Sequence, residues 1–192
     1  MFVPQHASMR LSCLRAEHRG RLSALLVATG AFSSEEVGVA LELFDATFNA
    51  GDESCRPERS PGPAFTSDRI ADYEFRGASN DGDALLGYAC FGPTPSSDGT
   101  YDLYWLAVDP EAQGCGVGRA LVRDVEQLLV ARQARLLAVE TSSRETYARS
   151  RDFYARCGYT EAARVRDFYA PAEDRIILTT RLMARPVGVA TR

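Results

Sequence analysis

Long apolar runs are missing from this sequence of 192 residues, and its start does not resemble a leader. No stretch comes near the roughly 20 consecutive apolar residues of a membrane-spanning helix, so we expect no such helix and no membrane partner. Residues 1–8 contain neither a basic nor an apolar segment, which argues against a secretory signal. We expect residues 1–8 to be a disordered lead-in and residues 9–192 to form one domain.

Cysteine pairs with metal-ligand or disulfide spacing are also missing. The five cysteines are scattered, and no two of them form a CxxC pair. Neither a disulfide framework nor a zinc site is indicated, and no metal is expected. A reducing cytoplasm is the simplest location for such a chain.

The sequence has no block of basic residues. Lysine is absent, and the 22 basic side chains, all arginines, are interspersed with 26 acidic ones for a net charge of −4. Nucleic-acid binding requires a basic face, so this class of function is excluded. A mildly acidic protein is compatible with a cationic substrate such as an amine.

Apolar periodicity and turn residues divide the chain into strands and helices. Ser33 and Glu36 form a capping box ahead of one helix. Residues 51–63 are rich in Gly, Pro, Ser and charge, which predicts a loop. The predicted strands are Met9–Leu14, Ile70–Phe75, Ala84–Phe91, Tyr101–Val108, Leu136–Thr141, Tyr159–Arg166 and Arg175–Leu182; the predicted helices are Glu17–Ala28, Ser34–Phe48, one starting at Val117, and Tyr147–Cys157.

The most informative stretch is the glycine-rich segment Gln113–Ala120, because it lies between a predicted strand and a predicted helix. Backbone N–H groups at a helix N-terminus point outward, and the helix dipole favours a negative charge there. The segment lacks the Lys-Ser or Lys-Thr pair of a Walker loop, and its glycine spacing does not fit a dinucleotide fingerprint. The pattern therefore predicts a site for another phosphate-bearing cofactor.

The pattern Gln-x-x-Gly-x-Gly, directly after a strand ending Leu-Ala-Val-Asp-Pro, resembles the acetyl-CoA loop of the GCN5-related N-acetyltransferases (GNAT). The resemblance continues through Leu136–Glu140, Tyr147–Tyr159 and Tyr169–Leu182, and it covers the second half of the chain well. It implies an α/β (α+β) fold: a mixed, mostly antiparallel sheet of six to seven strands flanked by about four helices, with one splayed strand pair.

The same resemblance implies acetyl-CoA as cosubstrate and a set of residues that bind it. The splayed strand would hold the pantetheine arm through its backbone, as an added strand would be held. The loop amides would hold the diphosphate, and Tyr147 stands where the family often has an asparagine that bonds the cofactor. The implied cofactor-binding residues are Leu106, Ala107, Val108, Gln113, Gly114, Cys115, Gly116, Val117, Gly118, Arg119 and Tyr147.

Two residues are implied for the chemistry. Tyr154, within Phe153-Tyr154-Ala155-Arg156-Cys157-Gly158-Tyr159, matches the family's tyrosine that protonates the leaving thiolate. Glu140 matches a carboxylate that acts as the base in the branch acetylating protein N-termini. Asp102 and Tyr104 compete with Glu140 for that role, and reaction of the free-amine fraction without a strong base is a further alternative.

The acceptor side is expected to include Asp102 and Tyr104 on one strand and Phe168 and Tyr169 in the last hairpin. The predicted function is transfer of an acetyl group to a primary amine on a small molecule, an amino acid or a peptide N-terminus. A non-catalytic acyl-CoA-binding sensor or assembly module is the alternative. A tRNA-acetylating toxin would need a basic groove. Oligomeric state stays open, with a homodimer as one option.

Overall fold

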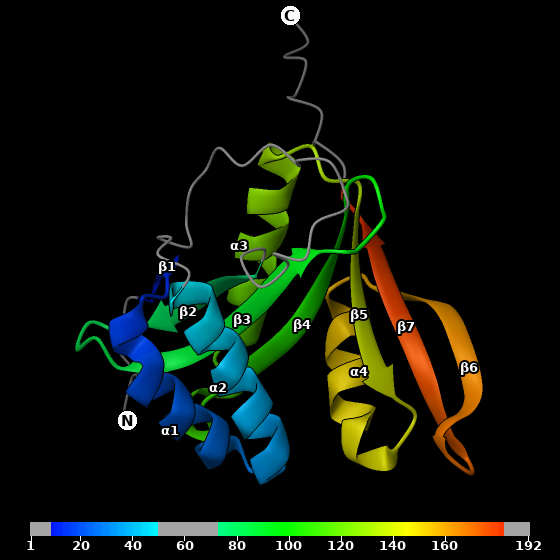
Figure 1. Cartoon of the computed structure of the whole chain (residues 1–192), viewed down its shortest axis with the longest axis horizontal. Helices are drawn as coiled ribbons and strands as arrows, with labels where there is room; N and C mark the ends of the chain where they lie inside the picture. Colours follow the sequence, from blue (N-terminus) through cyan, green and yellow to red (C-terminus); the bar gives the residue numbers. More distant parts are fainter. Residues whose placement is uncertain (1–8, 50–72, 183–192) are drawn as a thin grey trace, which may run out of the picture.

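Seven strands form one sheet in the order β1-β2-β3-β4-β5-β7-β6 in the computed structural model, which describes residues 9–49 and 73–182 (Figure 1). Neighbouring strands are antiparallel except for β4 and β5, which are parallel. The strands are β1 Arg10–Cys13, β2 Glu74–Ser79, β3 Leu85–Pro93, β4 Thr100–Val108, β5 Leu136–Ser142, β6 Thr160–Ala170 and β7 Glu173–Arg181. The predicted mixed, mostly antiparallel sheet is confirmed.

Four helices cover the two faces of this sheet (Figure 1). Helices α1 (Arg19–Thr29) and α2 (Ser34–Asn49) lie on one face, and α3 (Val117–Ala131) and α4 (Ala148–Arg156) lie on the other. Short 3-10 turns precede α1, α3 and α4; they are Ala16–His18, Pro110–Ala112 and Glu145–Tyr147. The predicted order of strands and helices along the chain is confirmed.

Local sequence signals account for the ends and faces of the helices. The predicted capping box of α2 is present: the Ser33 N–H donates to the Glu36 carboxylate at 2.7 Å, and the Glu36 N–H donates to Ser33 Oγ at 3.2 Å. Five apolar residues of α3 fall at helical spacing and are buried, and Leu128 and Val130 are partly buried beside them. The five buried residues are Val117, Leu121, Val122, Val125 and Leu129. These contacts hold α3 against the sheet with its N-terminus next to the end of β4.

Two apolar clusters, one on each face, hold the layers together. One cluster joins α3 and α4 to the sheet and includes Leu121, Leu137 and Ile176. The other joins α1 and α2 to β2, β3 and β4 and includes Leu26 and Phe44. Helix α1 packs on β3 and β4, so the face of β5, β7 and β6 on the α1–α2 side is left without a helix (Figure 1).

The strand predicted at Ile70–Phe75 is misplaced, because the structure puts β2 at Glu74–Ser79. Its last residues, Gly77, Ala78 and Ser79, have weak strand propensity and pair because of tertiary packing. A Cβ at Gly77 would lie 2.4 Å from Leu14 Cδ2, so this strand is held by a close approach that no local pattern reveals. The predicted lead-in 1–8 and the predicted loop 51–63 lie outside the described residues.

Candidate active site

Strands β4 and β5 separate after three residue pairs. The pairs are Thr100 with Leu136, Tyr101 with Leu137, and Asp102 with Ala138. Beyond Asp102, β4 continues to Val108 paired with β3 alone, and β5 continues to Ser142 paired with β7 alone. The splayed strand pair is therefore confirmed. Leu106, Ala107 and Val108 lie on the separated part of β4, and α4 lies between the diverging strands in the view of Figure 1.

A β-bulge at Tyr104 lies just past the point of separation. Cys90 pairs with Trp105 and Phe91 pairs with Leu103, which leaves Tyr104 without a partner on β3. The bulge turns Tyr104 and Trp105 toward the same face, where Trp105 packs on the α1–α2 cluster and the Tyr104 ring contacts the Tyr73 ring. A strict period-two alternation would put these two neighbours on opposite faces.

The loop between β4 and α3 presents a row of backbone donors. The first hydrogen bond of α3 runs from the Ala120 N–H to the Gly116 carbonyl at 2.9 Å. Within the described part of the chain, no acceptor is found for the amides of Gly114, Gly116, Val117, Gly118 and Arg119, and no side chain caps this helix. The Gln113 and Cys115 amides instead turn back to the carbonyls of Pro110 and Ala112, each at 3.4 Å.

Two glycines in this loop have backbone conformations that other residues rarely adopt. Gly114 has φ +79° and Gly116 has φ +87°, both in the left-handed region. No atom lies within 4 Å of a Cβ built at either glycine, so the space in front of the amides is open. The Cys115 thiol between them is free and exposed. The loop thus combines free donors with unobstructed access.

Arg119 lies at the first turn of α3, and its side chain extends toward α4. Its guanidinium donates to the Arg156 carbonyl at 3.3 Å. A small pocket of about 60 Å³ lies between these two helices, lined by Arg119, Val122, Arg123, Glu126, Arg156 and Cys157. The Glu126 carboxylate accepts a hydrogen bond from the Tyr159 hydroxyl at 3.0 Å. Three arginines and one glutamate line this pocket, so it carries a net positive charge, and Arg119 brings that charge close to the free amides.

Tyr154 lies on α4 and is 7% exposed. Its ring meets Phe153 and Tyr159 edge-on, and it belongs to the cluster against which Leu106 and Val108 pack. Burial raises the pKa of the Tyr154 hydroxyl well above its usual value, so the group stays protonated at neutral and alkaline pH. Among the described residues, none hydrogen-bonds this hydroxyl.

Tyr147 lies where β5 connects to α4, at the end of the 3-10 turn, and it is half-buried. Burial, and then the negative charge of Glu36, raise the pKa of its hydroxyl. Glu36 belongs to the first turn of α2. The structure thus brings the start of α2 near the start of α4, on the side where β4 and β5 are apart.

Glu140 lies on β5, on the face that α1 and α2 leave uncovered. Both of its carboxylate oxygens have partners: one forms an ion pair with Arg175, and the other accepts the Tyr169 hydroxyl. Burial, and then the hydrogen bond to Glu140, raise the pKa of Tyr169 to about 12. Asp102, the competing carboxylate, accepts a hydrogen bond from Thr94 Oγ1 at 2.7 Å.

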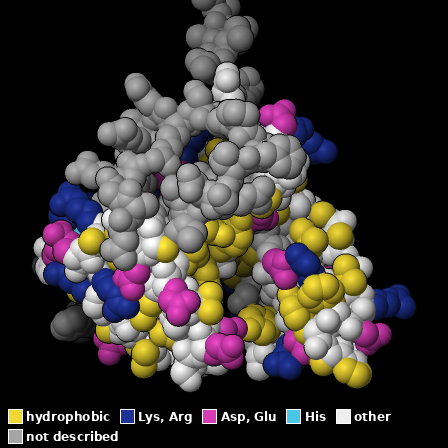
Figure 2. Space-filling model, viewed as in Figure 1, with side chains coloured by type: hydrophobic (Ala, Val, Ile, Leu, Met, Phe, Trp, Pro, Cys, Tyr) yellow, Lys and Arg dark blue, Asp and Glu magenta, His cyan; other side chains and the backbone are white. Residues whose placement is uncertain are grey.

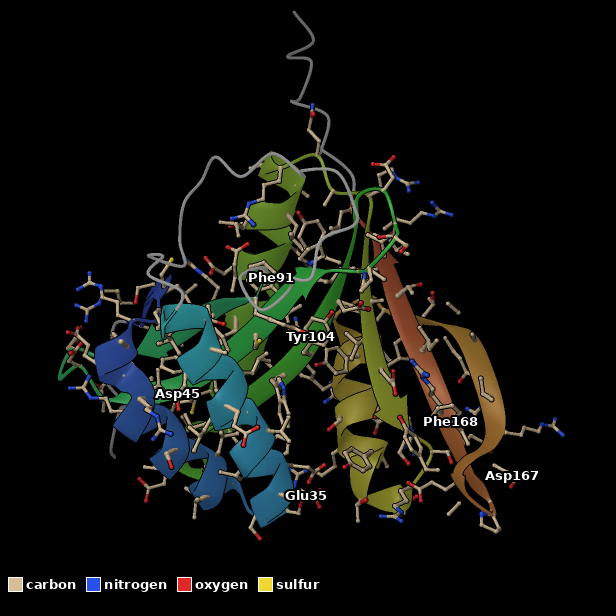
Figure 3. The ribbon with its side chains drawn as sticks, in the orientation of Figure 1. Glu35, Asp45, Phe91, Tyr104, Asp167 and Phe168 are labelled. Atoms are coloured by element: carbon tan, nitrogen blue, oxygen red, sulfur yellow. The ribbon has the colours of Figure 1, made fainter. Side chains whose placement is uncertain are left out.

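Phe168 and Tyr169 lie at the end of β6, and their rings contact each other edge-on at 4.9 Å. Arg175 places its guanidinium over the Phe168 ring, 4.9 Å from the centroid. Figure 3 shows Tyr104 beside β4 and Phe168 beside β7, with β5 between them. The sequence reasoning missed Arg175 and Tyr73. Both contact site residues that are distant in the sequence, and only the pairing of the strands brings them together.

The cysteines differ from the sequence expectation, which included no disulfide framework. Cys13 is disulfide-bonded, whereas Cys90, Cys115 and Cys157 are free. Over residues 9–49 and 73–182, no three His, Cys, Asp or Glu side chains gather as a metal-ligand set. No helix within those ranges has both the length and the apolar character needed to cross a bilayer.

Known proteins share this fold and the sequence pattern that accompanies it. The family model for the acetyltransferase (GNAT) family matches residues 40–159. A structure from Desulfovibrio desulfuricans assigned to the GNAT acetyltransferases is 33% identical, with a TM-score of 0.77, over 92% of this chain and 100% of the other. No curated protein sequence matches the chain.

Two more distant structures share the fold alone. The ribosomal-protein-S18-alanine N-acetyltransferase of Escherichia coli is 19% identical, with a TM-score of 0.62, over 96% of this chain and 99% of the other. An aminoglycoside 6′-N-acetyltransferase complexed with coenzyme A is 14% identical, with a TM-score of 0.64, over 92% and 99%. On the family match and the 33% identity, this chain belongs to the GNAT family of acetyltransferases.

Proposed function

We propose that the protein is an N-acetyltransferase that moves the acetyl group of acetyl-CoA to a primary amine on a small molecule, an amino acid or a peptide N-terminus. The amine attacks the thioester directly while both substrates are bound. One observation carries this proposal: the separated edges of β4 and β5 adjoin a row of free amides at the start of α3.

The free amides supply what a diphosphate requires. The amides of Gly114, Gly116 and Gly118, with those of Val117 and Arg119, lie at the positive end of a helix of 15 residues and lack acceptors within the described chain. The open space in front of Gly114 and Gly116 lets phosphate oxygens reach these donors. Gln113 and Cys115 shape the turn, because their own amides are already engaged.

The separated strand edge supplies what a pantetheine arm requires. From Leu106 to Val108, β4 has a strand partner on one side only, so its backbone can bond the amides of the arm as it would bond another strand. This arrangement directs the thioester into the space between β4 and β5. It also lets a backbone N–H near Leu106 or Ala107 stabilise the oxyanion that forms during transfer.

Tyr154 is proposed as the acid that protonates the leaving thiolate. Its hydroxyl has no partner among the described residues and stays protonated over the working pH range, because burial raises its pKa. A proton donor near the sulfur has a role only if the thioester bond breaks. This hydroxyl therefore favours an enzyme over the alternative, an acyl-CoA-binding module without turnover.

Glu140 and Asp102 are weaker candidates for a base, since partners already occupy both carboxylates. We therefore favour attack by the free-amine fraction of the acceptor, with its proton passing to water. In this proposal Glu140 holds Arg175 and Tyr169 in place beside the acceptor.

The test is CoA-thiol release from acetyl-CoA with a panel of primary amines, comparing wild type with Tyr154→Phe. We expect Tyr154→Phe to lower kcat by about 10²-fold or more and to leave CoA affinity within about twofold of wild type. Tyr159→Phe is the matched control: it removes a hydroxyl that bonds Glu126, and we expect kcat to change by less than about threefold. Tight CoA binding with no release on addition of any amine would favour the binding module.

A further inference from the structure

Tyr104 and Glu140 lie at equivalent positions just beyond the last residue pair of β4 and β5. Asp102 and Ala138 form the last pair between β4 and β5, and each of the two residues lies two positions further along its strand. Tyr104 is on the α1–α2 side, as its contact with Tyr73 shows, and Glu140 is on the same side, where it bonds Arg175. Together they border the point where the strands separate, on the face opposite α3 and α4.

We call the space between the separated parts of β4 and β5, on the α1–α2 side, the opening. Each of its two borders has an exposed aromatic ring that contacts a second aromatic ring. On the β4 border, Tyr104 is 39% exposed and its ring centroid lies 5.0 Å from that of Tyr73. On the β5 border, Tyr169 is 46% exposed, reaches Glu140 through its hydroxyl, and lies against Phe168. Figure 2 shows apolar side chains on both sides of the hollow between these two parts of the molecule.

The carboxylates of the three nearest strands are already engaged. Besides Glu140 and Asp102, they are two residues at the start of β7. Glu173 accepts Ser142 Oγ at 2.8 Å and forms an ion pair with Arg144 at 2.7 Å, and Asp174 pairs with Arg164 at 2.9 Å. Arginines thus pair with Glu140, Glu173 and Asp174, whereas Asp102 accepts only the neutral Thr94 hydroxyl and keeps its charge. Among the carboxylates of β4, β5 and β7, one negative charge is therefore left for a substrate, which suits one ammonium group better than several.

We infer that the acceptor is a small monoamine carried by an aromatic or similarly sized apolar group, held between Tyr104 and Tyr169. This inference rests on the proposed function. Apolar rings on both borders favour a flat apolar group, and the single carboxylate without an arginine partner on these strands disfavours a polycation. The amine nitrogen, at the other end of the acceptor, faces the space between β4 and β5.

Three amines distinguish the acceptor classes in the CoA-release assay: phenethylamine, ethylamine and the polycation kanamycin. We expect kcat/KM for phenethylamine to exceed that for ethylamine by about tenfold or more, because a phenyl group is buried on binding. Kanamycin is expected to stay at background.

Variants of the two tyrosines test where the phenyl group binds. Tyr104→Ala is expected to lower kcat/KM for phenethylamine by about tenfold and kcat/KM for ethylamine by less than about twofold. Tyr104→Phe keeps the ring, so we expect it to retain the wild-type preference for phenethylamine over ethylamine. Tyr169→Phe keeps the ring but loses the hydrogen bond to Glu140, so the preference for phenethylamine should persist. Val27→Ala on α1, an exposed apolar residue outside the opening, is the matched control. CoA affinity and the midpoint of urea unfolding verify that each variant is folded.

Turnover of kanamycin in preference to phenethylamine would overturn this inference and leave the proposed function intact. Equal losses for phenethylamine and ethylamine in Tyr104→Ala would overturn the placement of the apolar group. If no amine stimulates release although CoA binds, the inference falls together with the proposed function.

Discussion

At the scale of single residues, the environment of a side chain decides which chemical role it can take. Tyr154 is buried, protonated and without a partner among the described residues, so its hydroxyl is available for proton transfer. Glu140 is about half-exposed, yet Arg175 and Tyr169 hold both of its oxygens. The sequence motif points to Tyr154 alone as the acid but leaves Glu140 with competitors as the base, and the surroundings of each side chain separate their roles.

Glu140→Gln tests the positioning role of this residue. Without the charge, Arg175 loses its ion pair, and we expect kcat to fall by less than about tenfold, because no proton transfer depends on the carboxylate. The rise of kcat/KM with pH should follow deprotonation of the acceptor amine in both wild type and variant. Unfolding free energy is expected to change by less than about 1 kcal/mol, because this ion pair is partly exposed.

Glu161→Gln, which alters another exposed ion pair on β6, is the control for this variant. A loss of about 10²-fold or more in kcat, with the ascending limb of the pH profile abolished, would identify Glu140 as the base instead.

At the scale of elements, the β4–α3 loop depends on backbone conformation more than on side chains. Gly116 is the N-cap of α3 and has a left-handed φ, which costs a residue with a Cβ about 1–2 kcal/mol. No atom lies within 4 Å of a Cβ built at this position, so an added methyl group would fill open space beside the free amides. Both effects follow from a single methyl group.

Gly116→Ala should therefore lower both stability and cofactor affinity. We expect a loss of about 1–2 kcal/mol in unfolding free energy and a rise of about tenfold or more in the Kd for CoA, measured by calorimetry. Gly30→Ala is the matched control: Gly30 has φ +59° at the C-cap of α1, so the strain is similar, but CoA affinity should not change. Equal losses of CoA affinity in the two variants would contradict the proposed role of the loop.

Much of the element order could be predicted from sequence, because its signals are local. The capping box of α2 and the apolar spacing of α3 specify those helices directly. The bounds of β2 could not be predicted, because Gly77 and its small neighbours pair for reasons of packing. Motif residues such as Tyr154 and Gly116 could be identified, whereas the contact between Glu140 and Arg175 required the register of β5 on β7.

At the scale of the whole molecule, the absence of lysine means that few kinds of side chain control how the unfolding free energy changes at high pH. No lysine titrates near pH 10, and arginine stays charged, so tyrosine and cysteine dominate the response there. Three tyrosines are deeply buried: Tyr88, Tyr154 and Tyr159. Burial raises the pKa of each well above its usual value.

We therefore expect the unfolding free energy to be nearly constant from about pH 7 to 8 and to fall above about pH 8.5, first through the thiols of Cys90 and Cys157, whose pKa burial raises, and then through the tyrosines above about pH 10. Above that pH the unfolded chain releases tyrosine protons that the folded protein retains, so the unfolded state is favoured. Each tyrosine contributes a slope of up to about 1.4 kcal/mol per pH unit. Urea unfolding at a series of pH values measures this slope.

Tyr154→Phe should remove about one third of the slope that the three tyrosines produce, which links the measurement to named residues. A stability that stays constant up to about pH 11 would show that these hydroxyls ionise without unfolding.

The separation of β4 from β5 also constrains how this protein can change. From Leu103 onward, β4 forgoes the ladder bonds that a continuous sheet would make with β5, although both strands run several residues further. Substitutions that drew the two strands together would add bonds and raise heat resistance while closing the space between them. Selection for thermostability alone would therefore favour variants in which β4 and β5 pair along their whole length and the activity is lost. The separation of the two strands persists only where turnover is also selected.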